Sequence, residues 1–328
     1  MMRRNFSEVE EVKGLPNVLL ILSPEHFSLV KTFNKYANVF PYFIEPSSFI
    51  HVMHRVPGRM KADYKSFPSG MLTLLGKILN HPHKLKIKHV KPEDIDLVFV
   101  SDPVVCRIYL KKYKNAVKAY WSQDCIYQST FYTQLLSTKV QDYDIIFCAH
   151  KPYLEHFKEF GVKTYWLPFA YDPDICRPMD LPEKYDVTFV GTLTENRKRS
   201  LMKIKEKFPY LKIFFGTAFQ HNMAYIYNQS KVVLNISKIG ELNWRVFEAL
   251  GCRRALLTDK NNEVNEVFND GEHLMTYSGL NELFDKLETL LSEEDMRLRI
   301  ASTGYLEVSK RHTLYHRVKE ILRVCGVG

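Results

Sequence analysis

Short, almost uninterrupted apolar runs, each followed by a helical stretch, recur along this chain of 328 residues. In the first half they lie at residues 18–22, 97–100, 116–121 and 145–149. Apolar runs of strand length without polar alternation are typical of strands buried on both faces of a parallel sheet. The pattern therefore predicts an α/β fold for the first half of the chain.

The alternation is more regular in the second half of the chain. The sequence predicts strands at residues 185–191, 211–215, 232–236 and 254–258, and helices at 196–208, 223–229 and 244–251. Strands that alternate with helices form βαβ units and a parallel sheet. We therefore expect two Rossmann-like domains whose parallel sheets face each other across a ligand-binding cleft.

Prolines and a loss of periodicity over residues 167–173 predict a linker with hinge motion between the two halves. The expected division is an N-terminal domain over 1–166, a C-terminal domain over 167–310 and a last helix over 311–328 that could cross back to the first domain. Residues 46–92 combine Gly, Pro, His and basic residues with patchy periodicity. This segment is expected to contain a helix over 71–79.

The bulk composition favours a soluble, cytoplasmic protein. Apolar residues make up 45% of the chain and charged residues 25%, which is the balance of a globular protein. Residues 1–13 lack the apolar stretch of a signal peptide, and the apolar runs elsewhere are too short to span a membrane. The 6 cysteines form no CxxC pair, which fits reduced thiols better than disulfides or a zinc site.

A formal net charge of +9 favours anionic partners, among them sugar nucleotides, nucleic acids and acidic membrane surfaces. Lysines cluster at residues 84–91 and 111–118. These clusters are interpreted either as solvated faces or as surfaces for peripheral contact with the inner face of a membrane. Nucleic acid is the weaker partner, because no recognised nucleic-acid-binding module accompanies the charge.

Three stretches of the second half follow predicted strands, and open α/β sheets bind ligands at the carboxyl ends of their strands. The first stretch begins with Gly191, which lets backbone approach a ligand closely, and continues into a helix with Arg197 and Arg199. Guanidinium groups at a helix start fit a diphosphate. The same residues are also compatible with a basic helix that only faces solvent.

The second stretch, residues 216–221, contains Thr217 and His221. A loop of this kind could hold a nucleobase through backbone groups and a flat side chain.

The third stretch is a Gly-containing loop that passes through Asn243 into a helix with Arg245 in its first turn. Arg245 can bind a phosphate through two parallel hydrogen bonds. Glu248, three residues later, lies on the same helix face and can accept both hydroxyls of a ribose. Taken alone, Glu248 is equally compatible with a capping or solvated carboxylate.

Residues 143–322 resemble the CgeB-like group of GT-B glycosyltransferases, which is also described as spore-maturation-protein-like and as glycosyl transferases group 1. The order and spacing of the motifs carry the resemblance. They are YDVTFVGTLTENRKR from residue 185, YNQSKVVLNI from 227, NWRVFEALGCRRALLTD from 243, VFNDGEHLMTY from 267 and RHTLYHR from 311. In the first half the resemblance thins to LPFAYDPDICRP, from residue 167, and the Rossmann-like pattern.

The resemblance implies an acceptor side in residues 1–166 and a sugar-nucleotide site in residues 167–310. A UDP-sugar is the favoured donor substrate, with no cofactor and no metal. Glu248 matches the residue that binds the donor ribose, and Arg197 and Arg245 match positions near the donor diphosphate.

Two departures from the family pattern affect the inferred roles. Asp124 lies where many relatives carry a His-Asp pair that faces the donor sugar, but Gln123 stands in place of the histidine. Glu241 and Glu248 are seven positions apart, whereas the family often has two glutamates eight apart. We therefore assign no sugar-contacting role to Glu241.

The predicted reaction transfers a sugar to an unidentified acceptor hydroxyl on a glycan, a protein or a small molecule, and Arg245 stabilises the departing diphosphate. An inverting reaction needs a general base, for which Asp124 is the first candidate and His26 the second. A retaining reaction needs no strong protein base. The DxD motif at residues 172–174 contains a proline and is interpreted as a turn of the linker.

Two other functions stay open at this point. One is a non-catalytic GT-B protein that binds sugar nucleotides or glycans, because a fold does not define an activity. The other is a nucleic-acid-binding or nucleic-acid-modifying protein that uses the positive charge. The motifs GxGxxG, GxSxG and the P-loop are absent from the sequence, so dehydrogenase, hydrolase and P-loop NTPase chemistry have no support.

Overall fold

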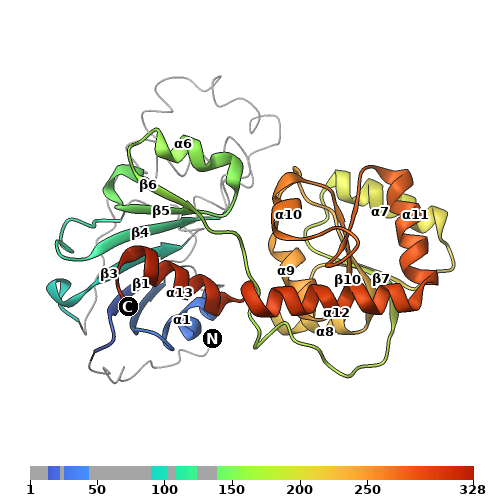
Figure 1. The fold of residues 1–328 in the computed structure, drawn as a ribbon, viewed down its shortest axis with the longest axis horizontal. Helices are drawn as coiled ribbons and strands as arrows, with labels where there is room; N and C mark the ends of the chain where they lie inside the picture. Colours follow the sequence, from blue (N-terminus) through green and yellow to red (C-terminus); the bar gives the residue numbers. More distant parts are fainter. Residues whose placement is uncertain (1–13, 23–25, 44–89, 102–107, 124–138) are drawn as a thin grey trace. The chain divides into compact units, whose positions relative to one another are not determined.

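The structure is a computed structural model that describes residues 14–22, 26–43, 90–101, 108–123 and 139–328. The helix predicted over residues 71–79 and the candidate base Asp124 lie outside these residues. The chain divides into two compact units, one formed from residues 1–168 and 318–328 and the other from residues 169–317 (Figure 1).

The first unit is built on a six-stranded parallel sheet with the strand order β2-β1-β3-β4-β5-β6. Its strands are β1 (Asn17–Leu22), β2 (Asn38–Phe43), β3 (Leu97–Ser101), β4 (Val117–Ser122), β5 (Ile145–Cys148) and β6 (Lys163–Trp166). β1, β3, β4 and β5 correspond to the four predicted apolar runs, whereas the edge strands β2 and β6 were not predicted. Because β1 lies between β2 and β3, the sheet has a switch point at the carboxyl ends of β1 and β3.

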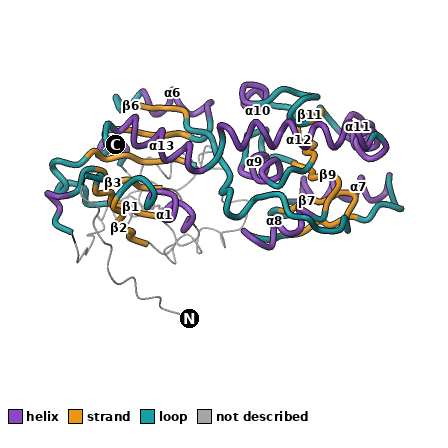
Figure 2. The backbone as a smooth tube through the Cα atoms, turned by 60° about the horizontal axis from the view of Figure 1, so that its bottom comes forward, coloured by secondary structure: helices purple, strands orange, loops and turns teal. Residues whose placement is uncertain are grey.

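The helices assigned to the first unit are α1 (Phe27–Phe33), α6 (Leu154–Lys158) and most of α13 (Leu314–Cys325), with 3-10 turns η3 (Pro92–Asp94), η4 (Val140–Asp142) and η5 (Lys151–Tyr153). From Val318 onward α13 lies against this sheet (Figures 1 and 2). It buries Val318 and Ile321, and the ammonium group of Lys319 lies 5.3 Å from the centroid of the Tyr36 ring.

The second unit contains a five-stranded parallel sheet with the order β11-β10-β9-β7-β8. Its strands are β7 (Tyr185–Val190), β8 (Ile213–Gly216), β9 (Ser230–Asn235), β10 (Ala255–Asp259) and β11 (Met275–Tyr277). The expected parallel α/β architecture of both halves is confirmed. Since β8 and β9 lie on opposite sides of β7, this sheet has its switch point between β7 and β9.

The helices of the second unit are α7 (Glu195–Lys207), α8 (Gln220–Asn228), α9 (Trp244–Gly251), α10 (Asn262–Val267), α11 (Leu280–Ser292) and α12 (Glu294–Arg311). Side chains cap three of them: the hydroxyl of Thr194 accepts from an N–H in the first turn of α7, and the amides of Asn243 and Asn261 do so for α9 and α10. Apolar residues of α7 and α11 pack with β7, β9 and β10 into one core. In the part of the chain that the structure describes, no helix combines the length and apolarity needed to cross a membrane.

Candidate functional site

The segments after β7 and β9 and the first turn of α9 come together at the switch point of the second sheet. Three of the predicted donor-binding residues, Gly191, Asn243 and Arg245, belong to these segments. Open α/β sheets bind ligands outside the carboxyl ends of the strands at such a point. This edge of the sheet is therefore the candidate site.

Arg245 is only 9% exposed and crosses the switch point. Its Nε donates to the carbonyl oxygen of Val190 at 2.7 Å, and its Nη1 donates to Oδ1 of Asn235 at 2.5 Å. Its guanidinium carbon lies 4.5 Å from the centroid of the Phe189 ring. A Cβ atom at Gly191 would lie 2.1 Å from Nη2 of Arg245. A glycine is thus needed at this position to admit the guanidinium group.

Arg197, on α7, is buried beside the same Phe189 ring. Its Nε and Nη2 donate to the carbonyl oxygen of Ile236 at 2.8 and 2.6 Å, and its Nη1 donates to that of Thr192 at 3.1 Å. Arg197 thereby ties the segment after β7 to the segment after β9. By contrast, Nη2 of Arg245 donates no hydrogen bond to any residue that the structure describes.

Asn235, the last residue of β9, connects the site to the neighbouring strands and was not predicted from the sequence. Its Oδ1 accepts from Arg245 and from Nδ2 of Asn243, the latter at 3.2 Å, and its Nδ2 donates to the hydroxyl of Thr258 at 2.8 Å. The carbonyl oxygen of Asn235 accepts from the hydroxyl of Tyr277 at 3.1 Å. An asparagine that ends an apolar strand run is the signal that could have indicated it.

Asn243 begins α9 by accepting the backbone N–H of Arg245 at 3.1 Å. Its φ of −111° and ψ of 172° are those of an extended N-cap residue. The predicted residue therefore orients the first turn of α9 and, through Asn235, the guanidinium group of Arg245.

Glu248 lies on α9 and is partly buried. Its carboxylate accepts no hydrogen bond from any described residue. Burial raises the pKa of Glu248 to about 7, and the positive charge of Arg245 opposes this rise. A carboxylate with open acceptor positions beside a guanidinium group can take a ligand that carries hydroxyl donors.

Two carboxylates shape the loop after β9. Glu241 accepts the backbone N–H groups of Lys238 at 2.9 Å and Ile239 at 2.8 Å. Asp259, whose pKa is raised by burial, accepts the N–H of Ser237 at 2.8 Å and its hydroxyl. The carboxylate of Glu241 is thus engaged by its own loop, and the loop leaves the Ile239 side chain 52% exposed.

Two predicted residues are exposed to solvent: Thr217 in the loop after the edge strand β8, and His221 in the first turn of α8. Between them lies Phe219, whose side chain is 81% exposed. Aromatic rings exposed in this way can stack on a nucleobase. Arg199 of α7 is also exposed, and its Nη2 donates to Oδ1 of Asn196.

The carboxyl edge of the first sheet carries its own polar network. Nδ1 of His26 lies 3.3 Å from the hydroxyl of Ser101, which accepts from Nε2 of Gln123 at 2.9 Å. Nε2 of His150 lies 3.0 Å from the carbonyl oxygen of Gln123. Ser101 and His150 were not predicted, and Asp124 follows this network outside the described residues. His26 thus lies at the switch point of the first sheet.

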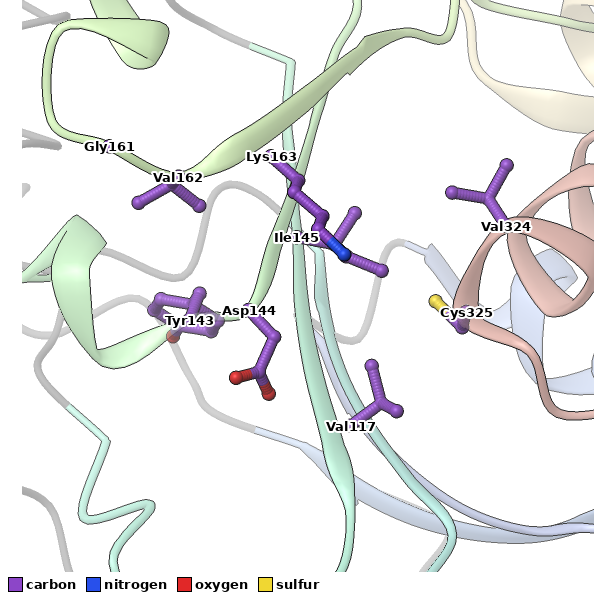
Figure 3. Close-up of a pocket in the computed structure, with 9 residues that line it drawn as sticks. All are labelled: Val117, Tyr143, Asp144, Ile145, Gly161, Val162, Lys163, Val324 and Cys325. Carbon is purple, nitrogen blue, oxygen red and sulfur yellow. The ribbon is translucent and has the colours of Figure 1, made fainter.

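The first unit also contains a cavity of about 460 Å³ (Figure 3). Its walls are the amino ends of β4, β5 and β6 and, from α13, Val324 and Cys325. The cavity therefore lies at the edge of the sheet opposite His26 and Ser101. Ligands of open α/β sheets bind at the carboxyl edge, so the cavity is not the candidate site.

Asp172 and Asp174 of the DxD motif lie in a turn, as predicted. The carboxylate of Asp172 accepts the N–H of Asp174 at 2.9 Å, and that of Asp174 accepts from the hydroxyl of Tyr315 at 3.1 Å. Among the described residues, no three His, Cys, Asp or Glu side chains converge as metal ligands would.

Solved structures with the same architecture have the GT-B fold and include a glycosyltransferase. A glycosyltransferase of Rickettsia africae is 11% identical, with a TM-score of 0.58, over 95% of this chain and 98% of that chain. HepE of Anabaena in complex with UDP and glucose is 12% identical, with a TM-score of 0.60, over 95% and 99%. Sucrose-phosphate synthase of Thermosynechococcus elongatus is 11% identical, with a TM-score of 0.59, over 94% and 98%. This protein thus has the GT-B fold.

The sequence comparison points to the same class for the part of the chain that holds the candidate site. Residues 175–323 match the family described as glycosyl transferase-like. The comparison with curated proteins gives no match.

Proposed function

We propose that this protein is a glycosyltransferase that moves a sugar from a nucleoside-diphosphate sugar, with UDP as the favoured nucleotide, to an acceptor hydroxyl. The observation that carries the proposal is the partly buried Glu248, whose carboxylate has open acceptor positions beside Arg245 at the switch point. The glycosyl transferase-like match of residues 175–323 and the UDP bound by HepE support it. The narrower resemblance to the CgeB-like group is part of the same proposal.

Glu248 would bind the ribose of the nucleotide. The two neighbouring hydroxyls of a ribose are donors, and an ionised carboxylate accepts both. Because its pKa is raised to about 7, Glu248 must lose a proton in part of the population before it can do so at neutral pH. Phe219, beyond β8, is the side chain that we propose for stacking with the base.

The diphosphate would lie at the start of α9. The positive end of the α9 dipole and Nη2 of Arg245 supply the positive potential that a leaving diphosphate needs. Arg197 contributes by holding the two strand-end segments together, and Gly191 by admitting the guanidinium group of Arg245. We propose that these groups neutralise the leaving group without a metal ion.

The acceptor would bind to the first unit. His26, at the switch point of the first sheet, is the described candidate for a general base, with its imidazole oriented by the hydroxyl of Ser101. Asp124 stays a candidate from the sequence. Either base is required only if the reaction inverts the anomeric configuration.

The first experiment measures donor binding by the shift of the unfolding midpoint with UDP, GDP, ADP, CMP and dTDP sugars, since a ligand of the native state raises that midpoint. Glu248→Gln should weaken binding of the best ligand by about tenfold, the size of one charge-assisted interaction. Glu288→Gln, an exposed carboxylate on α11, is the matched control and should leave the affinity unchanged. Equal affinities in wild type and Glu248→Gln would refute the placement of the ribose.

The second experiment separates an enzyme from a binding protein. Purified protein with the ligand found above should release UDP when acceptor-containing cell extract is added, and the rate should survive a chelating agent such as EDTA. Binding without any nucleotide release would favour a non-catalytic sugar-nucleotide-binding protein, and loss of turnover in EDTA would contradict the metal-free mechanism.

A further inference from the structure

Tyr227, in the last turn of α8, is fully buried, and its hydroxyl has no hydrogen-bond partner among the described residues. A buried hydroxyl left without a partner destabilises a folded protein, so such groups are rare. A phenylalanine would fill the same space without this cost. The hydroxyl therefore calls for an explanation other than packing.

The polar groups that surround Tyr227 come from three elements. The ionisable groups that act electrostatically on Tyr227 include Glu248 and Arg245 on α9, which packs against α8, and Cys252 directly after that helix. Cys176 faces it from the segment before β7. The free thiols of Cys176 and Cys252 form a hydrogen bond with each other.

Two groups in this buried cluster are left with unused hydrogen-bonding capacity. One is the hydroxyl of Tyr227, a donor, and the other is the carboxylate of Glu248, an acceptor. Burial beside Glu248 and the two thiols raises the pKa of Tyr227 well above its ordinary value, so the hydroxyl keeps its proton at neutral pH. The two groups are complementary, and they become strongly so when Glu248 is ionised.

We propose that Tyr227 is a positioning residue for Glu248: when Glu248 ionises, the Tyr227 hydroxyl donates a hydrogen bond to one carboxylate oxygen and leaves the other for the ribose of a sugar nucleotide. This inference rests on the proposed function. It explains how a carboxylate in a poorly solvated place can be ionised and oriented at the same time. Tyr227 itself has no exposed surface and does not touch the ligand.

The direct test is a pH titration of Glu248 in the ligand-free protein. The carboxyl is monitored by carbon-13 NMR of labelled glutamate side chains, and Glu248→Gln assigns the signal. In Tyr227→Phe the pKa of Glu248 should rise by about one unit, which is the tenfold effect of one hydrogen bond to a charged acceptor. Tyr185→Phe, at the amino end of β7, is the matched control and should leave the titration unchanged. The other titratable groups of this cluster are Arg245, Cys176 and Cys252.

The second readout is the pH dependence of donor binding. If Tyr227→Phe raises the pKa of Glu248 by about one unit, the variant should bind UDP-sugar about five- to tenfold more weakly than wild type at pH 7, with a smaller difference at pH 8.5 where more of the carboxyl is ionised in both proteins. In the Glu248→Gln background, Tyr227→Phe should have no further effect on affinity. The unfolding midpoint of Tyr227→Phe should be unchanged or raised, because the unsatisfied hydroxyl is gone.

The outcomes distinguish a failure of this inference from a failure of the proposed sugar-transfer function on which it rests. A wild-type protein without affinity for any UDP-sugar refutes the proposed function, and the inference falls with it. A wild-type protein that binds through Glu248, combined with an unmoved Glu248 titration or a pH-independent effect in Tyr227→Phe, overturns the inference alone.

Discussion

At the scale of single residues, the candidate site depends on a close approach between a glycine and an arginine. Gly191 leaves the space that Nη2 of Arg245 occupies, and the guanidinium group lies over the Phe189 ring. An arginine held in this way loses little conformational freedom when it binds an anion, because its position is already fixed.

Gly191→Ala should therefore displace the guanidinium group of Arg245 and weaken UDP-sugar binding by about tenfold, measured by calorimetry. The added Cβ would meet Nη2 at 2.1 Å, so a loss of about 1–3 kcal/mol of folding stability is also expected. Gly271→Ala is the control, since that glycine also has a positive φ but open space around it. It should cost stability and leave the affinity intact. A Gly191→Ala protein with wild-type affinity would contradict the role of this contact.

A second prediction at this scale concerns the charge of Glu248. Its pKa in the folded protein, about 7, lies above the ordinary value of 4.5. Between these two values the folded state binds more protons than the unfolded state, so the free energy of unfolding falls as the pH rises. Glu248→Gln removes this loss, and it should be more stable than wild type by up to about 3 kcal/mol well above pH 7.

The measurement is chemical denaturation of both proteins from pH 4.5 to pH 8.5. The gain in Glu248→Gln should shrink toward pH 4.5, where the wild-type carboxyl is protonated in the folded state and half protonated in the unfolded state. A difference that stays constant over this range would show that the carboxyl of Glu248 is not perturbed.

At the scale of elements, the start of α9 is the part on which the site depends most. Asn243 caps this helix and also hydrogen-bonds to Asn235, which in turn holds Arg245. The helix has eight residues, so its orientation is set by its first turn and by packing rather than by its own stability.

Asn243→Ala should cost about 1 kcal/mol of folding stability and should also weaken UDP-sugar binding severalfold, because Arg245 loses its support. Asn261→Ala removes the corresponding cap of α10, where Oδ1 accepts the N–H of Val264 at 2.9 Å. This matched variant should lose similar stability and keep its affinity. Equal affinities in the two variants would show that the cap of α9 has no role in the site.

The strands that could be predicted from the sequence are those buried on both faces, because an apolar run leaves few other interpretations. β2 was missed since Pro41 interrupts its pattern, and a proline is tolerated there because β2 is an edge strand. β6 was missed because its four residues are alternately exposed and partly buried. Edge strands carry the weakest signal, since half of their surroundings is solvent.

The site could be predicted only in part, for a related reason. The sequence indicates which residues follow strands, but it does not show which hydrogen bonds they form. Arg197 and Arg245 look alike in the sequence. In the structure, Nε, Nη1 and Nη2 of Arg197 all donate hydrogen bonds to backbone carbonyl oxygens. Asn235 stands out only as a polar residue that ends an apolar strand run, and Tyr227 has no spacing that separates it from the other aromatic residues of α8.

At the scale of the whole molecule, the proposed donor site belongs to the second unit alone. Hydrogen exchange with and without UDP should therefore show added protection in residues 190–194 and 236–246, since a bound ligand suppresses local opening. The measurement is mass spectrometry of the exchanged peptides from the full chain. Protection confined to the cavity of Figure 3, at the amino ends of β4 to β6, would place the nucleotide in the first unit and contradict the proposal.

The second unit is one continuous stretch of chain, whereas the first unit is completed only by residues 318–328. On the ribosome, residues 169–317 therefore emerge as a whole before the residues that complete the first unit. The sheet of the first unit then still lacks the buried side chains of Val318, Ile321 and Leu322 of α13. Domains made first usually fold first during synthesis. Here we expect the order to be reversed: residues 169–317 can fold as soon as they leave the ribosome, whereas the sheet of the first unit keeps an apolar face uncovered until residues 318–328 have followed.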